Sequence, residues 1–208
     1  MQIIPVIDLK QGRVVHARMG DRDSYAPIRS GLCEGSEPLS IVAGLIRLYP
    51  FEALYVADLD AIAGTGGHDP VLETLRRRFP ALRLWVDRGV ASLEEAQGWL
   101  ARGLGDLVLG SESLDDPAMP ERLARTEPSR IVLSLDFRGE DFQGPRELLQ
   151  RTDLWPTRII VMTLSRVGSG SGPDFARLAD IRGRAGAATE VYAAGGVRDM
   201  DDLRKLAS

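Results

Sequence analysis

Cysteine and histidine are scarce in this sequence. It contains one cysteine, Cys33, and two histidines, His16 and His68. A single cysteine cannot close an intramolecular disulfide, so a disulfide scaffold and a Cys-rich zinc module are both excluded. Two histidines leave little for a His-based metal site, and we expect no bound metal. Cys33 has no triad-like neighbours in the sequence, and we expect it to be chemically inert.

The sequence also lacks an excess of basic residues over acidic ones, and it lacks long hydrophobic runs. The chain has 26 Lys and Arg against 30 Asp and Glu, a net charge of -4, so it lacks the basic field that drives nucleic-acid binding. No stretch approaches the ~20 apolar residues of a membrane-spanning helix. Residues 1–8 have no basic region before their apolar run and indicate a buried strand, not a signal peptide. We therefore expect a cytoplasmic protein with neither nucleic acid nor membrane as a partner.

Short apolar runs alternate with helical patterns along all 208 residues. The runs are rich in Val, Ile and Leu and lack polar alternation, which is typical of parallel strands covered on both faces. Seven such runs occur, at Ile3–Ile7, Leu54–Ala57, Leu82–Val86, Leu107–Leu109, Ile131–Leu135, Ile159–Met162 and Val191–Ala194. Seven strand-then-helix units without a linker predict one α/β domain over residues 1–208.

The helices between these runs carry recognisable end signals. Ser92 and Glu95 form a capping box before an apolar stripe. Two Asp-Pro pairs indicate helix starts and two glycines indicate C-terminal caps: Asp69-Pro70, Asp116-Pro117, Gly103 and Gly183. The regular pattern is interrupted by the excursion at 10–37, where residues 12–17 predict a small extra hairpin.

Two architectures fit alternating strands and helices: an open doubly wound sheet and a closed (β/α)₈ TIM barrel. Internal similarity favours the barrel, because the first three units resemble the last three and indicate two half-barrel repeats. The paired segments are 8–13 with 136–140, 58–69 with 163–174, and 89–95 with 196–202. A barrel of this kind needs eight strands, usually in about 250 residues. We therefore expect the eighth βα unit to lie outside this chain, in a longer protein or in a second chain.

Two aspartates at strand ends are the candidate catalytic residues. Asp8 ends the first run and Asp136 the fifth, which places them on opposite walls at the C-terminal face where this fold builds its active sites. Two facing carboxyls can divide proton removal from carbon and proton delivery to oxygen. The alternative is that each acid merely caps a loop or pairs with a neighbouring base.

Glycine-rich turns are the candidate phosphate sites. Gly195 and Gly196 follow the seventh run, and Gly89 follows the third. Such turns let backbone N–H groups approach an anion next to a helix N-terminus. With Ser111 after the fourth run, Gly89 forms a second candidate site, and two sites would suit a substrate with phosphate at both ends. Ordinary βα-turn chemistry uses glycine too and remains the alternative.

Taken together, these residues resemble the isomerase and cyclase barrels of histidine biosynthesis. The matching stretches are Pro5–Val15, Met19–Asp21, Tyr55–Ile62, Ser134–Asp136 and Ala193–Val197. The resemblance implies a cofactor-free isomerase that opens a phosphorylated aminoaldose ring and forms an aminoketose. It further implies that Asp8 removes the C2 proton, Asp136 protonates the ring oxygen and Thr163 assists. Gly89 and Ser111 would bind one phosphate, and Gly195 and Gly196 part of another.

Some positions depart from that family. It usually has three glycines and an arginine after the third strand, where this chain has Asp87-Arg88-Gly89-Val90-Ala91, and a His-Thr pair where this chain has Met162-Thr163. An acid at Asp87 would repel phosphate unless Arg88 compensates. Two alternatives therefore stay open: a divergent paralogue that acts on another phosphorylated substrate, and a binding barrel without turnover. The oligomeric state is not predicted.

Overall fold

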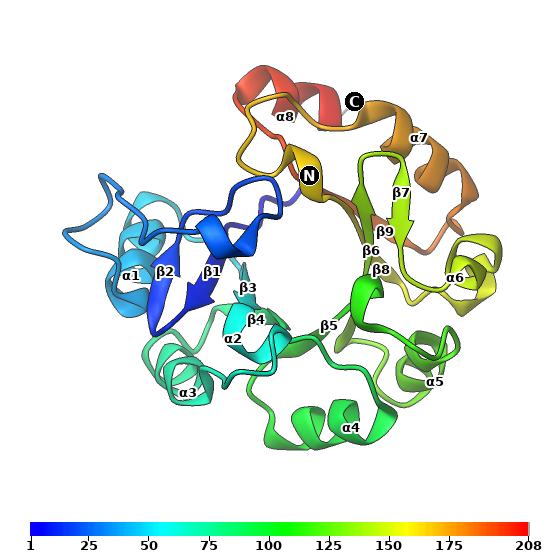
Figure 1. Cartoon of the computed structure of the whole chain (residues 1–208), viewed down its shortest axis with the longest axis horizontal. Helices are drawn as coiled ribbons and strands as arrows, with labels where there is room; N and C mark the ends of the chain where they lie inside the picture. Colours follow the sequence, from blue (N-terminus) through cyan, green and yellow to red (C-terminus); the bar gives the residue numbers. More distant parts are fainter. Residues whose placement is uncertain (208) are drawn as a thin grey trace.

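Seven parallel strands form one curled sheet in the computed structural model, which describes residues 1–207. In sheet order they are β1 (Val6–Lys10), β3 (Ala53–Asp58), β4 (Arg83–Asp87), β5 (Asp106–Gly110), β6 (Ile131–Arg138), β8 (Arg158–Thr163) and β9 (Glu190–Ala194). Each of them overlaps one of the seven predicted apolar runs, so the α/β prediction is confirmed. The first run was placed too early, since β1 begins at Val6 and not at Ile3, and β1 and β6 continue past Asp8 and Asp136. Figure 1 shows the strands around a common centre, with open space between β1 and β9. Within the described residues these two strands are not paired.

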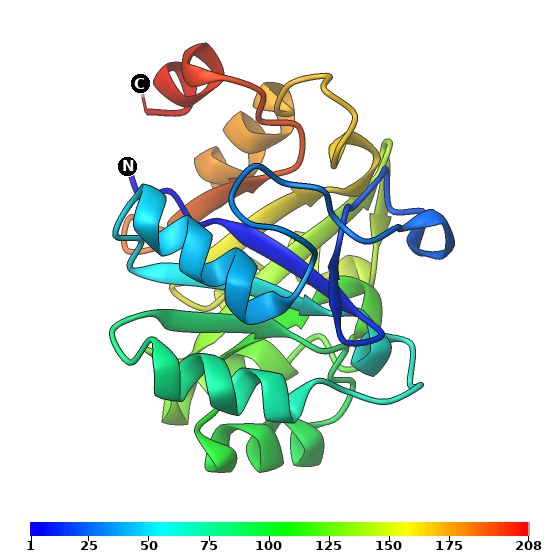
Figure 2. The same cartoon turned by 90° about the vertical axis from the view of Figure 1, so that its left-hand side faces the viewer.

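Helices cover the outer face of this sheet (Figures 1 and 2). They are α1 (Pro38–Leu48), α3 (Asp69–Arg78), α4 (Leu93–Arg102), α5 (Met119–Thr126), α6 (Arg146–Gln150), α7 (Phe175–Arg184) and α8 (Met200–Ala207). The short α2 (Leu59–Ile62) instead follows the end of β3, and its Leu59 packs inside the curled sheet. Four 3₁₀ turns accompany them: η1 (Arg22–Ser24), η2 (Ser111–Ser113), η3 (Thr152–Leu154) and η4 (Leu164–Arg166). Among residues 1–207, no helix is long and apolar enough to cross a bilayer.

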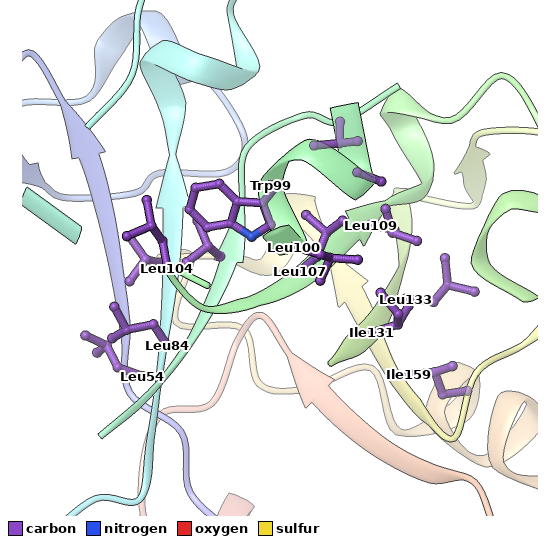
Figure 3. Close-up of a cluster of buried hydrophobic side chains, with 14 of the residues drawn as sticks. Leu54, Leu84, Trp99, Leu100, Leu104, Leu107, Leu109, Ile131, Leu133 and Ile159 are labelled. Atoms are coloured by element: carbon purple, nitrogen blue, oxygen red, sulfur yellow. The ribbon is translucent and has the colours of Figure 1, made fainter. Parts of the chain in front are cut away.

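The core has two layers, because side chains alternate between the two faces of each strand. One layer lies between sheet and helices; there Leu84 and Leu107 pack with Trp99 and Leu100 of α4 (Figure 3). The other fills the space inside the curled sheet and is smaller. It contains Val15, Tyr55, Ala57, Leu59, Trp85, Val108, Val132 and Ile160. Buried apolar side chains of the strands thus pack either on the helix side or on the inner side.

Local sequence signals located both ends of α4 and the start of α3, and were wrong for α5 and α7. The capping box of Ser92 and Glu95 is formed, and Gly103 ends α4 in the left-handed region at φ 64°. Helix α3 begins at Asp69 with Pro70 in its first turn, which confirms the predicted helix start, but its N-cap is His68 and not Asp69. The prediction at Asp116-Pro117 is wrong: α5 begins at Met119, because Asp116 accepts a hydrogen bond from the Ala118 N–H and closes a turn first. Gly183 is also not a cap, since it lies inside α7.

Two small antiparallel hairpins extend strands on opposite sides of the sheet. Strand β2 (Arg13–Val15) pairs antiparallel with β1 and confirms the predicted hairpin. Strand β7 (Asp141–Gln143) pairs with β6 in the same way and was not anticipated. In register, Asp8 lies opposite Val15 and Asp136 opposite Gln143. Both candidate catalytic aspartates therefore lie on strands that a hairpin braces.

Candidate functional site

Asp8 and Asp136 lie on the inner side of the sheet, on opposite strands. Asp8 is flanked by Ile7 and Leu9, which belong to the helix-side core, and alternation turns its side chain inward. The same argument applies to Asp136 between Leu135 and Phe137. Strands β1 and β6 face each other across the centre in Figure 1. The structure thus brings the two predicted carboxyls to facing walls of one space.

Asp136 is buried and enclosed by hydrogen bonds. Ser134 Oγ donates to its Oδ1 at 2.6 Å, and Ser111 Oγ accepts from its backbone N–H at 2.9 Å. Burial raises the pKa of Asp136 to about 8, helped by the charges of Asp87 and Glu112 and opposed by the Ser134 hydrogen bond. At neutral pH this carboxyl therefore holds its proton, as a general acid must.

Asp8 has a more open setting. Its side chain is half-buried, and its carboxylate makes no hydrogen bond to any residue in the described part of the chain. Burial raises the pKa of Asp8 to about 7; the Arg22 guanidinium lowers it and the charge of Asp87 raises it. The Asp8 carboxyl can therefore exchange its proton near neutral pH, and no hydrogen bond within residues 1–207 occupies its oxygens. That is the state of a general base.

A third carboxyl and a tyrosine complete the inner wall, and the sequence did not assign either of them a catalytic or binding role. Tyr55 Oη donates to Asp87 Oδ2 at 3.1 Å, and the Gly89 N–H donates to Asp87 Oδ1 at 3.1 Å. Burial raises the pKa of Asp87 to about 6. Burial, together with the charges of Asp87, Asp136 and Asp8, also raises the pKa of Tyr55 well above its usual value. Both residues lie on the inner side of β3 and β4, but no signal in the sequence marks that side, because these strands are buried on both faces.

The long segment after β2 lies over this site and is fastened to neighbouring loops. Lys10 Nζ donates to the Arg22 carbonyl at 2.6 Å, and Arg22 forms an ion pair with Glu112 at the end of β5. The Met19 N–H donates to the Val167 carbonyl at 2.7 Å, beyond the end of β8. The segment therefore connects the ends of β1, β5 and β8, and carries one cation, Arg22, into the acidic site.

The predicted phosphate glycines lie at two places. A Cβ at Gly195 would lie 2.6 Å from the Thr163 carbonyl oxygen, and one at Gly196 would lie 2.3 Å from that of Gly172. Both have positive φ, so this close approach of the β9 and β8 loops requires glycine. At the other end, the Gly89 N–H is bonded to Asp87, and Ser111 is buried with its Oγ donating to the Gln143 carbonyl at 2.6 Å. Phosphate binding at these four residues stays a prediction.

Comparison with known proteins identifies the relatives of this chain. The family model described as histidine biosynthesis protein matches residues 2–208. The chain belongs to the histidine biosynthesis protein family. This confirms the resemblance drawn from the sequence.

Among the relatives of this family member is the 1-(5-phosphoribosyl)-5-((5-phosphoribosylamino)methylideneamino)imidazole-4-carboxamide isomerase of Symbiobacterium thermophilum. It is 30% identical over 223 residues, which cover 99% of this chain and 85% of that protein. The isomerase of the same name from Halorhodospira halophila is 28% identical and covered to 85%. An uncharacterized protein of Methanocaldococcus jannaschii is 30% identical over 98% of this chain and 85% of its own length. Isomerases and a protein without assigned function are thus about equally similar.

Thr163, for which the histidine biosynthesis family implies an assisting role, ends β8 and is buried. Along the strand it follows Ile159 and Val161, which pack on the helix side, whereas Met162 packs with the inner layer. No hydrogen bond joins its hydroxyl to Asp8 or Asp136 within residues 1–207. The assisting role of Thr163 stays a prediction. In the same range no group of three or more His, Cys, Asp or Glu side chains could hold a metal ion.

His68, which the sequence left without a role, holds the β1–β2 turn of this family member in place. Its Nδ1 lies 2.7 Å from Asp58 Oδ1, and its Nε2 accepts from the Gly12 N–H at 2.9 Å. Beside it, Asp60 Oδ2 accepts from the N–H of Gln11, a residue with φ 50°. Asp58 is fully buried, and its pKa is lowered mainly by the His68 hydrogen bond against the opposing effect of burial. A buried Asp–His pair thus fixes the turn from which the covering segment starts.

We expect His68→Ala to lower the free energy of unfolding by about 2–4 kcal/mol, because it leaves the Asp58 carboxylate buried with fewer partners. Chemical denaturation at pH 7 measures this effect. His16→Ala is the matched control, since His16 is exposed and its loss should change stability by less than about 0.5 kcal/mol. Equal stability of the two variants would contradict the role given to His68.

Proposed function

We propose that this chain is an acid–base isomerase that converts a phosphorylated aminoaldose into the corresponding aminoketose. The observation that carries the proposal is the pair of inward carboxyls in different surroundings: Asp136 is enclosed by hydrogen bonds and the Asp8 carboxylate makes none within residues 1–207. Asp136 has its pKa raised to about 8 and is buried, while Asp8 has its pKa raised to about 7 and is free of hydrogen bonds. Facing carboxyls whose environments separate their protonation states are suited to acid and base roles. The isomerases among the relatives support the same reaction class.

The reaction would begin with ring opening. Asp136 gives its proton to the ring oxygen, the C1–O bond breaks toward that oxygen, and the nitrogen lone pair forms a C1–N double bond. Asp8 then removes the C2 proton; the C–H electron pair forms the C1–C2 double bond, and the C–N π pair returns to nitrogen. Loss of the enol proton to the Asp136 carboxylate and protonation of C1 by Asp8 give the ketone at C2. Atoms and charge balance, and both carboxyls return to their starting states.

Substrate binding is assigned to the glycine turns. In this proposal Gly195 and Gly196 direct backbone N–H groups at a phosphate where the β8 and β9 loops meet. An eighth βα unit would complete a (β/α)₈ barrel beside these turns, between β9 and β1. The covering segment with Arg22 would exclude water while the enolamine exists.

We expect the purified chain to convert an N-aryl ribosylamine 5-phosphate, prepared from ribose 5-phosphate and 4-methylaniline, into the N-aryl aminoketose. NMR of the sugar carbons measures the conversion directly. Well-folded protein that binds this compound without converting it would overturn the proposal and leave the non-catalytic binding barrel. The control is a reaction without protein, because glycosylamines rearrange slowly by themselves.

A second candidate differs only in the substrate. The printed name of the related isomerases contains two phosphoribosyl groups, whereas Asp87 in this chain occupies the Gly89 N–H where one anion would bind. This arrangement favours a paralogue that acts on another phosphorylated compound. Rescue of a histidine auxotroph that lacks the isomerase would decide for the histidine-pathway substrate. Growth failure with well-folded protein would decide for the paralogue.

A further inference from the structure

One end of the site is formed by β4 and β5. There the groups that could bind an anion already form hydrogen bonds within the protein. The Gly89 N–H donates to Asp87 Oδ1 at 3.1 Å, and the Glu112 N–H points to Asp136 Oδ2 at 3.4 Å. The Ser111 hydroxyl donates to the Gln143 carbonyl and accepts from the Asp136 N–H. A phosphate arriving here would compete with the carboxyls of Asp87 and Asp136 for the two N–H groups, and with the Gln143 carbonyl for the Ser111 hydroxyl.

Two carboxyls converge at the same end: Asp136, which holds its proton at neutral pH, and Asp87, which is the anion of the pair. Both carboxyls lie close to Gly110. A Cβ on this glycine would lie 3.3 Å from Asp87 Oδ2 and 3.4 Å from Asp136 Oδ2. Arg88 does not offset this charge, because its guanidinium bonds Asp69 at 3.0 Å and stacks over the Trp99 ring at 4.7 Å. Arg22 is paired with Glu112. The Arg22 charge lowers the pKa of Asp87, but within residues 1–207 the Asp87 carboxylate forms no ion pair.

The opposite end, formed by the β8 and β9 loops, has cations. Arg166 Nη1 donates to the Gly172 carbonyl at 2.9 Å, and that carbonyl also lies against Gly196. A Cβ at Gly172 would lie 3.2 Å from the Arg198 guanidinium carbon. Arg198 is paired with Asp202, whereas Arg166 bonds only backbone carbonyls. The two ends of the site therefore differ in the sign of the charge that they would attract.

We propose that Asp87 sets substrate specificity by excluding phosphate from the β4–β5 end and binding a protonated amine there, while the β8–β9 end takes the single phosphate. The proposal rests on the proposed function, since it assigns the two ends of the same substrate. It replaces the phosphate role predicted for Gly89 and Ser111. The substrate class is a ribosylamine monophosphate whose nitrogen substituent ends in an amine.

Three ligands that share the ribityl phosphate and the aryl ring test this assignment. Ribose 5-phosphate is condensed with 4-(aminomethyl)aniline, 4-methylaniline or 4-aminobenzyl phosphate, and reduction gives stable N-aryl ribitylamine 5-phosphates that differ only in the distal group. Calorimetric titration at pH 7 should show the aminomethyl compound binding at least about tenfold more tightly than the methyl compound, as for a hydrogen bond between charged groups. The distal phosphate compound should bind most weakly.

Variants then locate the effect. Asp87→Asn keeps the shape and removes the charge, so the preference for the aminomethyl compound should fall to less than about threefold. Asp115→Asn is the control, because Asp115 is an exposed acid in the following loop and its loss should leave the preference unchanged. Tightest binding of the distal phosphate compound to the wild type, or a preference that survives Asp87→Asn in folded protein, would overturn the inference alone. Binding of none of the three would overturn the proposed function as well, since all of them carry the ribityl phosphate.

Discussion

Asp8→Asn and Asp136→Asn are each expected to lower kcat on the N-aryl ribosylamine 5-phosphate by about 10²–10⁴-fold, the usual effect of removing a general acid or base. An amide can neither accept the C2 proton nor deliver one to the ring oxygen. Asp141→Asn is the matched control, because Asp141 is exposed on β7, opposite Arg138 in the β6–β7 hairpin. Its kcat should equal that of the wild type.

The pH profile distinguishes the two roles. The base must be ionised and the acid protonated, and the two pKa values are about 7 for Asp8 and about 8 for Asp136. The kcat/KM of the wild type should therefore rise toward pH 7 and fall above pH 8. Because the two carboxyls interact, the apparent pKa values of the rising and falling limbs describe the pair of residues. Residual activity of Asp8→Asn should lose the rising limb, and that of Asp136→Asn the falling limb. Variants that keep both limbs would show that these carboxyls do not carry the protons.

Replacing Asp136 by asparagine should raise the stability of the protein, although it lowers activity. Its folded pKa of about 8 exceeds the usual 3.8, so the folded state holds a proton that the unfolded state releases between these values. The contribution of Asp136 to stability is thus fully present below pH 4 and is lost as pH rises through 8. Asparagine resembles the protonated acid and does not titrate. Between pH 5 and 8.5, Asp136→Asn should therefore gain on the order of 3 kcal/mol over the wild type, or about 6 to 12 °C in Tm.

Thermal unfolding of both proteins across this pH range measures the difference. Asp141→Asn again serves as the control and should follow the wild type at every pH. Parallel curves for wild type and Asp136→Asn would contradict the protonated state of Asp136 and remove it as the acid. A variant that is more stable but inactive is the expected result where a buried ionisable group is kept for catalysis.

Charged side chains show where sequence reasoning succeeded and where it failed. Asp8 and Asp136 were found because each ends an apolar run, and parallel strand ends meet at one face of the sheet. Asp87 also ends a run, yet it was interpreted only as a departure from a phosphate site. Its partners Tyr55 and Gly89 come from different strand and turn positions, and no spacing in the sequence reveals that they converge. His68 was missed for the same reason, since its partners Gly12 and Asp58 lie 56 and 10 residues away.

The sequence by itself determined the alternation of strands and helices, the order of the strands and the pair of aspartates. These follow from local hydrophobicity and from the repeat of one half of the chain in the other. Only the tertiary structure decided which face of each strand is inner, because runs buried on both sides carry no polar alternation to mark it. Packing alone likewise brought Asp87 and Asp136 to the two sides of Gly110, and burial then raised their pKa values. The protonation state of a carboxyl depends on the solvent it loses, and that loss exists only in the folded chain.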